Sequence, residues 1–227
     1  MRKTVYAVAI DGPGGAGKSS IARAIARKLN ILYVDTGAIY RTVGYYVYFR
    51  GQQPTDAAAV IALLPEIHIE MKYGDDGLQR MYLNGEDVTD RIRLPEMSMY
   101  ASHVSAIPEV RAFLMEMQRS CARENCVVMD GRDIGTIVLP DAQVKIFLTA
   151  DAMERAKRRH KELVERGTAT DFEQLLEEMR QRDYNDSHRA TAPLRPAEDS
   201  VIVDTTDLDF EQSCNRILEI IKERVGE

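Results

Sequence analysis

The stretch AIDGPGGAGKSS, which runs from Ala9 to Ser20, decides the fold of this chain. It satisfies the pattern G-x-x-x-x-G-K-[ST], with a short apolar run before it and apolar residues at helical spacing after it. Glycines let the backbone wrap closely, so that its N–H groups face phosphate oxygens, and the helix N-terminus adds partial positive charge. The sequence therefore predicts a strand, a phosphate-binding loop and a helix in that order.

Two side chains of this loop are expected to act directly on a bound nucleotide. Lys18 supplies an ammonium group for the β and γ phosphates, and the Ser19 hydroxyl can ligate Mg²⁺. The residues expected to bind the nucleotide are Gly12, Pro13, Gly14, Gly15, Ala16, Gly17, Lys18, Ser19 and Ser20. The alternative is a glycine-rich turn that only packs a helix against a strand. GTPases, ATP-driven machines and small-molecule kinases share this loop, so it leaves the class of protein open.

Short apolar runs rich in β-branched residues alternate with helical patterns along the chain. The runs expected to be buried strands are 5–10, 31–34, 126–130, 144–148 and 201–204. Their alternation with helices predicts an α/β fold, with a mostly parallel sheet covered on both faces. Residues 210–225 carry isoleucine and leucine on one side and are expected to form a helix packed on that sheet.

The segment 67–92 has a different pattern. Short runs of strand type are joined there by GDDG and NGE, which are turn sequences. We expect a small antiparallel sheet inserted between elements of the core. Helices are expected after it at 95–103 and 108–123, each with a proline near its first turn.

The composition is that of a soluble globular protein, with 44% hydrophobic and 29% charged residues among 227. A formal charge of −6 argues against a sequence-independent grip on long nucleic acid. The three cysteines fit neither a paired metal site nor an even disulfide framework. No secretory signal or membrane-spanning run is recognised. We therefore expect a cytoplasmic monomer with no nucleic-acid or membrane partner.

Candidate acceptor-binding residues follow two of the expected strands. In DTGAIYR, Thr36 is expected to cap the next helix, and Tyr40 and Arg41 come about one turn later. In MDGRDIGT, Arg132 and Asp133 follow the third strand, beyond the edge where open parallel sheets bind ligands. A surface turn with an ion pair is the alternative there. Asp130, at the end of this strand, is the natural carboxylate for Mg²⁺ or its waters.

Clustered arginines late in the chain admit two interpretations. Arg155, Arg158 and Arg159 lie within one and a half turns of an expected helix, as either a solvated face or a lid over the transferring phosphoryl group. Arg182, Asp186 and Arg189 have the spacing i, i+4 and i+7, which lines one helix face. They form either a ladder of salt bridges or a site for sugar hydroxyls and a phosphate.

Seven segments together resemble the bacterial cytidylate kinase family, in order and over nearly the whole chain. They are IDGPGGAGKSS, VDTGAIYR, NGEDVTDRIR, ASHVSAIPEVR, DGRDIGTIVLPDAQVKIFLTA, RAKRR and RDYNDSHRATAPL. DGRDIGT together with RDxxDSxR is much more specific than the phosphate loop. The resemblance implies one kinase domain over 1–227: a P-loop core (about 1–35, 124–150 and 190–227), a monophosphate-binding region with the insert (about 36–123) and a mobile lid (about 151–189).

The resemblance also implies roles for the acceptor residues. Ser102, Arg111 and Asp133 would read cytosine, Arg182 and Asp186 the sugar, and Arg41, Arg132 and Arg189 the acceptor phosphate. Thr36 and Tyr40 would line the same site. A carboxylate accepts a hydrogen bond from the cytosine N4 amine but faces the O4 acceptor of uracil, which predicts a preference for cytosine. The deoxy form is implied as a second substrate.

The hypothesis is transfer of a phosphoryl group from MgATP to CMP or dCMP. The groups expected to act on that phosphoryl group are Lys18, Arg132, Arg155, Arg158, Arg159 and Arg189, with Ser19 and Asp130 at the metal. One alternative is a kinase for another small acceptor. Another is a regulatory nucleotide-binding module, but the guanine-reading sequence Asn-Lys-x-Asp is absent from the chain.

Overall fold

The computed structural model describes residues 5–165, 167 and 171–226 and divides the chain into two compact units. The divisions fall between Leu32 and Tyr33 and between Glu124 and Asn125. The first unit therefore holds both ends of the described chain, and the second unit holds its middle. Residues 166 and 168–170, within the lid range expected from the sequence, lie outside the described residues.

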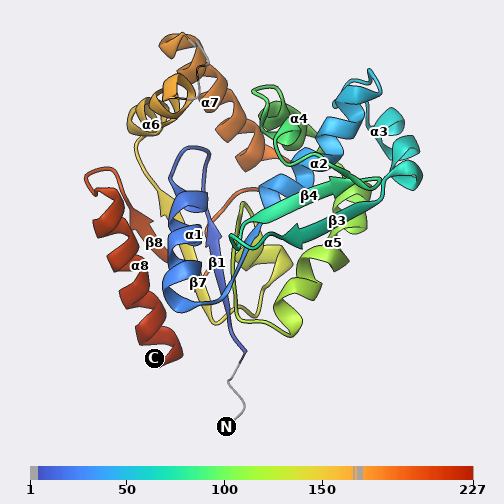
Figure 1. Ribbon diagram of the computed structural model, residues 1–227. Helices are drawn as coiled ribbons and strands as arrows, with labels where there is room; N and C mark the ends of the chain where they lie inside the picture. Colours follow the sequence, from blue (N-terminus) through green and yellow to red (C-terminus); the bar gives the residue numbers. More distant parts are fainter. Residues whose placement is uncertain (1–4, 166, 168–170, 227) are drawn as a thin grey trace. The chain divides into compact units, whose positions relative to one another are not determined.

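A parallel sheet with the order β2–β6–β1–β7–β8 underlies the first unit (Figure 1), and its edge strand β2 contributes only Leu32 to that unit because the boundary falls after this residue. Its strands are β1 (Ala7–Asp11), β2 (Leu32–Asp35), β6 (Val127–Gly131), β7 (Val144–Thr149) and β8 (Val201–Asp204). β1 is completely buried and pairs in parallel with β6 on one side and with β7 on the other. β6 is also buried along its whole length, and strands buried on both faces read as continuous apolar runs, which is why the sequence indicates these two strands clearly.

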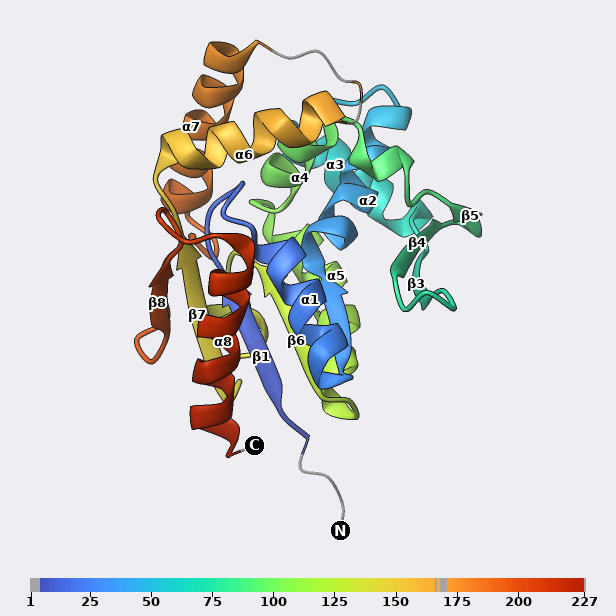
Figure 2. The ribbon, with the colours of Figure 1, turned by 60° about the vertical axis from the view of Figure 1, so that its left-hand side comes forward.

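Helices of the first unit cover this sheet and extend beyond it. They are α1 (Lys18–Leu29), the π-helix η3 (Ile134–Val138), α6 (Ala152–Glu165), α7 (Phe172–His188) and α8 (Phe210–Val225). α1 and α8 lie side by side on one face of the sheet (Figure 2). α6 and α7 pack on each other near the carboxyl ends of the strands, and we call this pair the lid.

The second unit combines helices with a small antiparallel sheet of order β3–β4–β5. Its strands are β3 (Ile69–Tyr73), β4 (Gln79–Leu83) and β5 (Glu86–Asp87). Its helices are α2 (Thr36–Phe49), α3 (Ala57–Leu63), α4 (Met97–Val104) and α5 (Pro108–Arg123), with short 3₁₀ turns η1 (Leu64–Glu66) and η2 (Arg91–Arg93). One apolar core joins α2 and α4 to the sheet through side chains such as Ile39, Met81 and Val104.

The structure confirms the α/β class, the parallel sheet and the antiparallel insert expected from the sequence. The strand at 201–204 and the helices at 108–123 and 210–225 have the expected bounds, and the other parallel strands differ by one or two residues. The helix expected at 95–103 begins at Met97, because Pro95 stands before the first helical turn. No helix in the described ranges is long and apolar enough to span a membrane.

Candidate active site

Backbone conformation makes two glycines of the phosphate loop irreplaceable. Gly12 has φ +146°, and a Cβ there would lie 1.9 Å from the Leu148 carbonyl oxygen of β7. Gly15 has φ +75°, and a Cβ there would meet the Arg155 carbonyl at 3.0 Å. Only glycine adopts these conformations without strain. The loop therefore packs tightly between β7 and the lid, as a phosphate cradle requires.

The lysine of the loop is buried, and the serine that follows it is half-buried. The Lys18 ammonium donates a hydrogen bond to the Pro13 carbonyl at 2.7 Å, and the Ser19 hydroxyl donates to Asp130 Oδ2 at 2.8 Å. Burial, and then the nearby Arg132, lower the pKa of Lys18 below its ordinary value. The structure thus brings together Ser19 and Asp130, which come from α1 and from the end of β6.

Asp11, the last residue of β1, holds the segment that follows β6. Its two carboxylate oxygens accept hydrogen bonds from the Ile134 and Gly135 N–H groups, both at 2.7 Å. Burial raises the pKa of this carboxyl to about 7, against the opposing effect of those hydrogen bonds. Asp11 had no role in the sequence interpretation, because its partners lie more than a hundred residues away.

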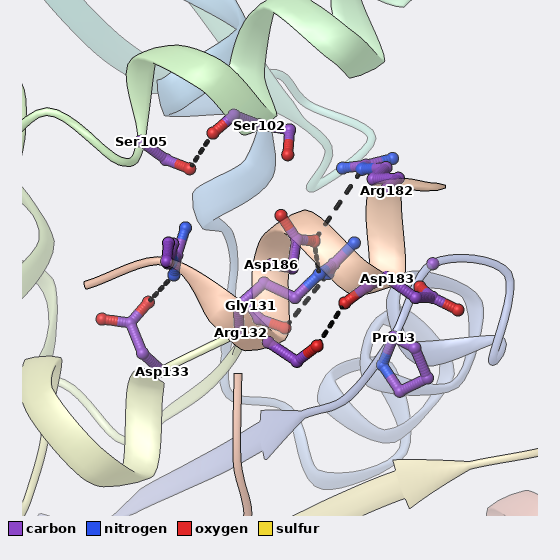
Figure 3. Close-up of polar contacts among 12 residues, drawn as sticks. Pro13, Ser102, Ser105, Gly131, Arg132, Asp133, Arg182, Asp183 and Asp186 are labelled. Atoms are coloured by element: carbon purple, nitrogen blue, oxygen red, sulfur yellow. Dashed lines mark hydrogen bonds and ion pairs between the residues drawn. The ribbon is translucent and has the colours of Figure 1, made fainter. Parts of the chain in front are cut away.

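Asp186 is the centre of an arginine cluster in the first unit (Figure 3). Its carboxylate pairs with Arg132 Nε at 2.9 Å and with Arg182 Nε at 3.9 Å, and its side chain is 3% exposed. A Cβ built on Gly14 of the phosphate loop would lie 3.7 Å from Arg132 and 3.8 Å from Arg182. Two guanidinium groups therefore converge beside the loop on one buried carboxylate.

Arg189 and Asp133 form a second buried pair. Arg189 Nη2 lies 3.6 Å from Asp133 Oδ1, and both side chains are nearly fully buried. The expectation that Arg189 continues the helix face of Arg182 and Asp186 is wrong, because α7 ends at His188 and Arg189 has extended backbone angles. Its Nε instead donates to the Ala192 carbonyl at 2.8 Å, which turns the side chain toward Asp133.

The three clustered lid arginines have three different environments. Arg155 is buried and donates to the carbonyls of Gly14 and Ala150 while pairing with Asp183 of α7 at 2.7 Å.

Arg158 instead donates to the carbonyl and hydroxyl of Thr205, beyond β8. Arg159 pairs with Glu162 of its own helix at 2.7 Å. Within this cluster, Arg155 is the residue in contact with the phosphate loop, and Arg158 holds the lid to the sheet.

In the second unit, Asp35 organises the start of α2. Its Oδ1 accepts the Ala38 N–H at 2.8 Å and its Oδ2 pairs with Arg41 at 2.9 Å. The cap of α2 is therefore Asp35, and the expectation that Thr36 caps this helix is wrong. β2 continues to Asp35, which makes Thr36 the first helical residue. Although burial alone would raise the pKa of Asp35, Arg41 and the Ala38 N–H hold it below its ordinary value.

The other acceptor candidates of the second unit form a group around Arg111 and Tyr40. The Arg111 guanidinium lies 5.8 Å from the centre of the Tyr40 ring and donates to the Ser105 carbonyl at 3.3 Å. The Ser105 hydroxyl in turn donates to the Ser102 carbonyl at 2.9 Å (Figure 3). The second unit thus groups Arg111 with Tyr40, which is distant in the sequence, and links Arg111 through Ser105 to Ser102.

The cytidylate kinase family model matches residues 8–223 of this chain. The chain belongs to the cytidylate kinase family. It is 50% identical over 213 residues to the cytidylate kinase of Caldicellulosiruptor bescii, with 94% of each chain covered. It is 48% identical over 226 residues to the cytidylate kinase of Geobacillus sp. strain WCH70, with 100% of each covered.

One solved structure, an uncharacterized protein from Eubacterium ventriosum, shares the fold with TM-score 0.54. It is 14% identical, with 96% of this chain and 99% of that chain covered. At this identity the likeness concerns the fold alone.

The oxygen atoms beside the phosphate loop of this cytidylate kinase family member suit Mg²⁺. Mg²⁺ prefers oxygen ligands and commonly uses one or two protein groups, with waters and substrate phosphates completing its shell. Ser19 and Asp130 supply a hydroxyl and a carboxylate 2.8 Å apart. Within the described ranges no group of three or more acidic, His or Cys side chains gathers as a metal site.

Proposed function

We propose that this chain catalyses phosphoryl transfer from MgATP to CMP and dCMP, yielding ADP and CDP or dCDP. The observation that carries the proposal is the convergence of Arg132 and Arg182 beside Gly14, next to the buried Lys18. A nucleotide hydrolase places an arginine at the γ-phosphate of its single nucleotide. A kinase needs a second cationic group, because its acceptor carries a phosphate of its own.

Each side chain then performs a positioning or charge-neutralising task. Lys18 holds the β and γ phosphates of the donor, and Arg132 and Arg189 hold the acceptor phosphate together with Arg41. Arg155 joins the lid to the phosphate loop through the Gly14 carbonyl. Ser19 and Asp130 would hold Mg²⁺, which would supply neutralising charge to the phosphates. The acceptor oxygen is already anionic, so no general base is required.

The acceptor assignment extends to the remaining residues. Thr36, Tyr40, Ser102 and Arg111 of the second unit bind CMP in this proposal, as do Asp133, Arg182 and Asp186 of the first. Lid closure, in which Arg158 and Arg159 contribute positive charge, excludes water from the γ-phosphoryl group. We propose that the chain works as a cytoplasmic monomer, with small-molecule nucleotides as its partners rather than nucleic acid or membrane.

The direct test measures ADP formation from MgATP with CMP, dCMP, UMP, AMP, dTMP or no acceptor. We expect strong turnover with CMP and dCMP, weak turnover with UMP, and almost none without acceptor. Equal rates across the panel, or hydrolysis independent of acceptor, would contradict the proposal.

Asp133→Asn tests the base-reading step separately. Asparagine can donate to the uracil O4 as well as accept from the cytosine amine, so the ratio of kcat/KM for CMP to that for UMP is expected to fall about tenfold. Asp183→Asn, in the same unit but paired with Arg155, is the matched control and should leave this ratio unchanged. Base selectivity unaltered in Asp133→Asn would remove Asp133 from the recognition of cytosine.

A further inference from the structure

The outer edge of β2 is hydrogen-bonded by side chains of the antiparallel sheet rather than by another strand. The Tyr73 hydroxyl donates to the Tyr33 carbonyl at 2.8 Å. Gln79 Oε1 accepts the Asp35 N–H at 2.8 Å, and Gln79 Nε2 donates to the Asp35 carbonyl at 3.2 Å. Three main-chain groups of β2 are therefore satisfied by two side chains.

These three groups lie on one edge of the strand. The N–H and C=O of a residue in a strand point to the same edge, and successive residues alternate between edges. Tyr33 and Asp35 thus face one way, while the Leu32 N–H donates to the Cys126 carbonyl on the other edge. Gln79 and Tyr73 take the place of a neighbouring strand at the Tyr33 carbonyl and at both main-chain groups of Asp35.

The Tyr73 and Gln79 side chains stand next to each other on the small sheet. Tyr73 and Gln79 are directly opposite each other in the β3–β4 register, so they stand on the same face of the small sheet. Gln79 is 7% exposed, and burial raises the pKa of Tyr73, which keeps its hydroxyl protonated as a donor. An amide with both its donor and its acceptor engaged by one residue fixes that residue in position and in rotation.

The residue fixed in this way is the cap of α2. The Asp35 carboxylate receives the Ala38 N–H and pairs with Arg41, so the position of the Asp35 main chain sets where the Arg41 guanidinium is held. We propose that Gln79, supported by Tyr73, is a positioning residue for the acceptor phosphate, acting through Asp35 on Arg41. This inference rests on the proposed function, in which Arg41 binds that phosphate, and it gives the antiparallel insert a role in acceptor binding.

The test replaces the amide with an apolar side chain of similar size. Gln79→Leu removes both hydrogen bonds to Asp35, and we expect the KM for CMP and the calorimetric Kd for CMP to rise about tenfold. The KM for ATP at saturating CMP should change less than twofold. The ratio of kcat/KM for CMP to that for UMP should also hold, because the phosphate is common to both acceptors.

Gln118→Leu is the matched control. Gln118 belongs to the same unit and is fully buried, and its amide donates to the Leu114 carbonyl of its own helix. The same substitution there should leave both KM values unchanged. Equal rises for CMP and ATP in Gln79→Leu, or the same rise in Gln118→Leu, would identify a merely structural role and overturn the proposal.

Tyr73→Phe keeps the proposal testable if Gln79→Leu does not fold. It removes a single hydroxyl, and we expect a rise of about threefold in the KM for CMP with that for ATP unchanged. Unchanged CMP affinity in both variants would refute the positioning role. Wild-type protein that neither binds nor phosphorylates CMP would refute the proposed function instead, so the two failures are distinguishable.

Discussion

Asp11 ends β1 in the first unit and Asp35 ends β2 in the second, and the same residue type does different work at the two strand ends. The Asp11 carboxylate is buried and the Asp35 carboxylate is half-buried, and both accept backbone N–H groups. Asp35 also has a guanidinium partner, Arg41, and its pKa lies below the ordinary value. Among the described residues Asp11 shows no such ion pair, and burial raises its pKa to about 7.

The difference follows from what each strand end presents to a ligand. The end of β1 leads into the phosphate loop, where positive charge must stay available for the donor phosphates, and Asp11 is bonded to main-chain N–H groups instead. The end of β2 leads into α2, where Asp35 pairs with Arg41, the guanidinium that binds the acceptor phosphate in the proposed function. A positive group held by a carboxylate is oriented before the ligand arrives.

The largest expected effect is a loss of activity when the phosphate loop after β1 is changed. Lys18→Ala removes the ammonium of the phosphate loop, and we expect kcat/KM for ADP formation with CMP to fall on the order of 10³-fold. Lys222→Ala, on the exposed face of α8, is the control and should retain wild-type activity. A Lys18→Ala protein with activity within tenfold of wild type would contradict the role of the loop.

Replacing the glycine that follows each strand end, Gly12 after β1 and Gly37 after β2, should change the free energy of unfolding by different amounts. Gly12→Ala places a Cβ 1.9 Å from a main-chain oxygen, so we expect the free energy of unfolding to fall by about 3 kcal/mol or more. Gly37→Ala in α2 meets the terminal nitrogen of Arg41 at 2.8 Å, and that long side chain can move.

The unfolding free energy of Gly37→Ala should therefore change by less than about 1 kcal/mol, while its KM for CMP rises. Urea denaturation of both variants measures the contrast, and equal losses of stability would contradict it.

The smallest effect concerns pH. A carboxyl whose pKa is raised on folding binds its proton more tightly in the folded state, so its contribution to stability declines as pH rises toward 7. Between pH 5 and pH 7.5 we expect the unfolding free energy of wild type, relative to Asp11→Asn, to fall by about 2.5 kcal/mol.

The unfolding free energy of wild type relative to Asp35→Asn should stay constant between pH 5 and pH 7.5. The pKa of Asp35 is lowered on folding, so the contribution of this carboxylate to stability is lost only in acid below about pH 4. Chemical denaturation at the two pH values gives both differences. A flat result for Asp11→Asn would show that its carboxylate is ionised throughout.

Features encoded by neighbouring residues were predictable from the sequence. The phosphate loop, the parallel strands and the antiparallel insert follow from local pattern, and the motif pairing that identified the family lies in two continuous segments. Asp130, the carboxylate predicted to bind the metal, contacts the Ser19 hydroxyl. The sequence could indicate this pair because one residue lies at the end of a strand and the other follows the phosphate loop.

Features that depend on tertiary partners were not predictable. Helical spacing made Arg155, Arg158 and Arg159 equivalent, although one contacts the phosphate loop, one Thr205 and one its own helix. Thr36 and Asp35 both suit a helix cap, and the choice depends on where β2 ends. Gln79 carries no local signal at all, since its function comes from the strand edge that it covers.

The most direct test of the different roles of the two strand ends is to measure, by calorimetry, the binding of CMP and of a MgATP analogue to Arg41→Ala and Lys18→Ala. We expect Arg41→Ala to lose about 100-fold in affinity for CMP, as a guanidinium–phosphate contact is removed, while its affinity for a non-hydrolysable MgATP analogue stays within twofold. Lys18→Ala should show the reverse pattern. Loss of both ligands in both variants, or of neither in Arg41→Ala, would contradict the assignment of donor binding to the end of β1 and of acceptor-phosphate binding to the end of β2.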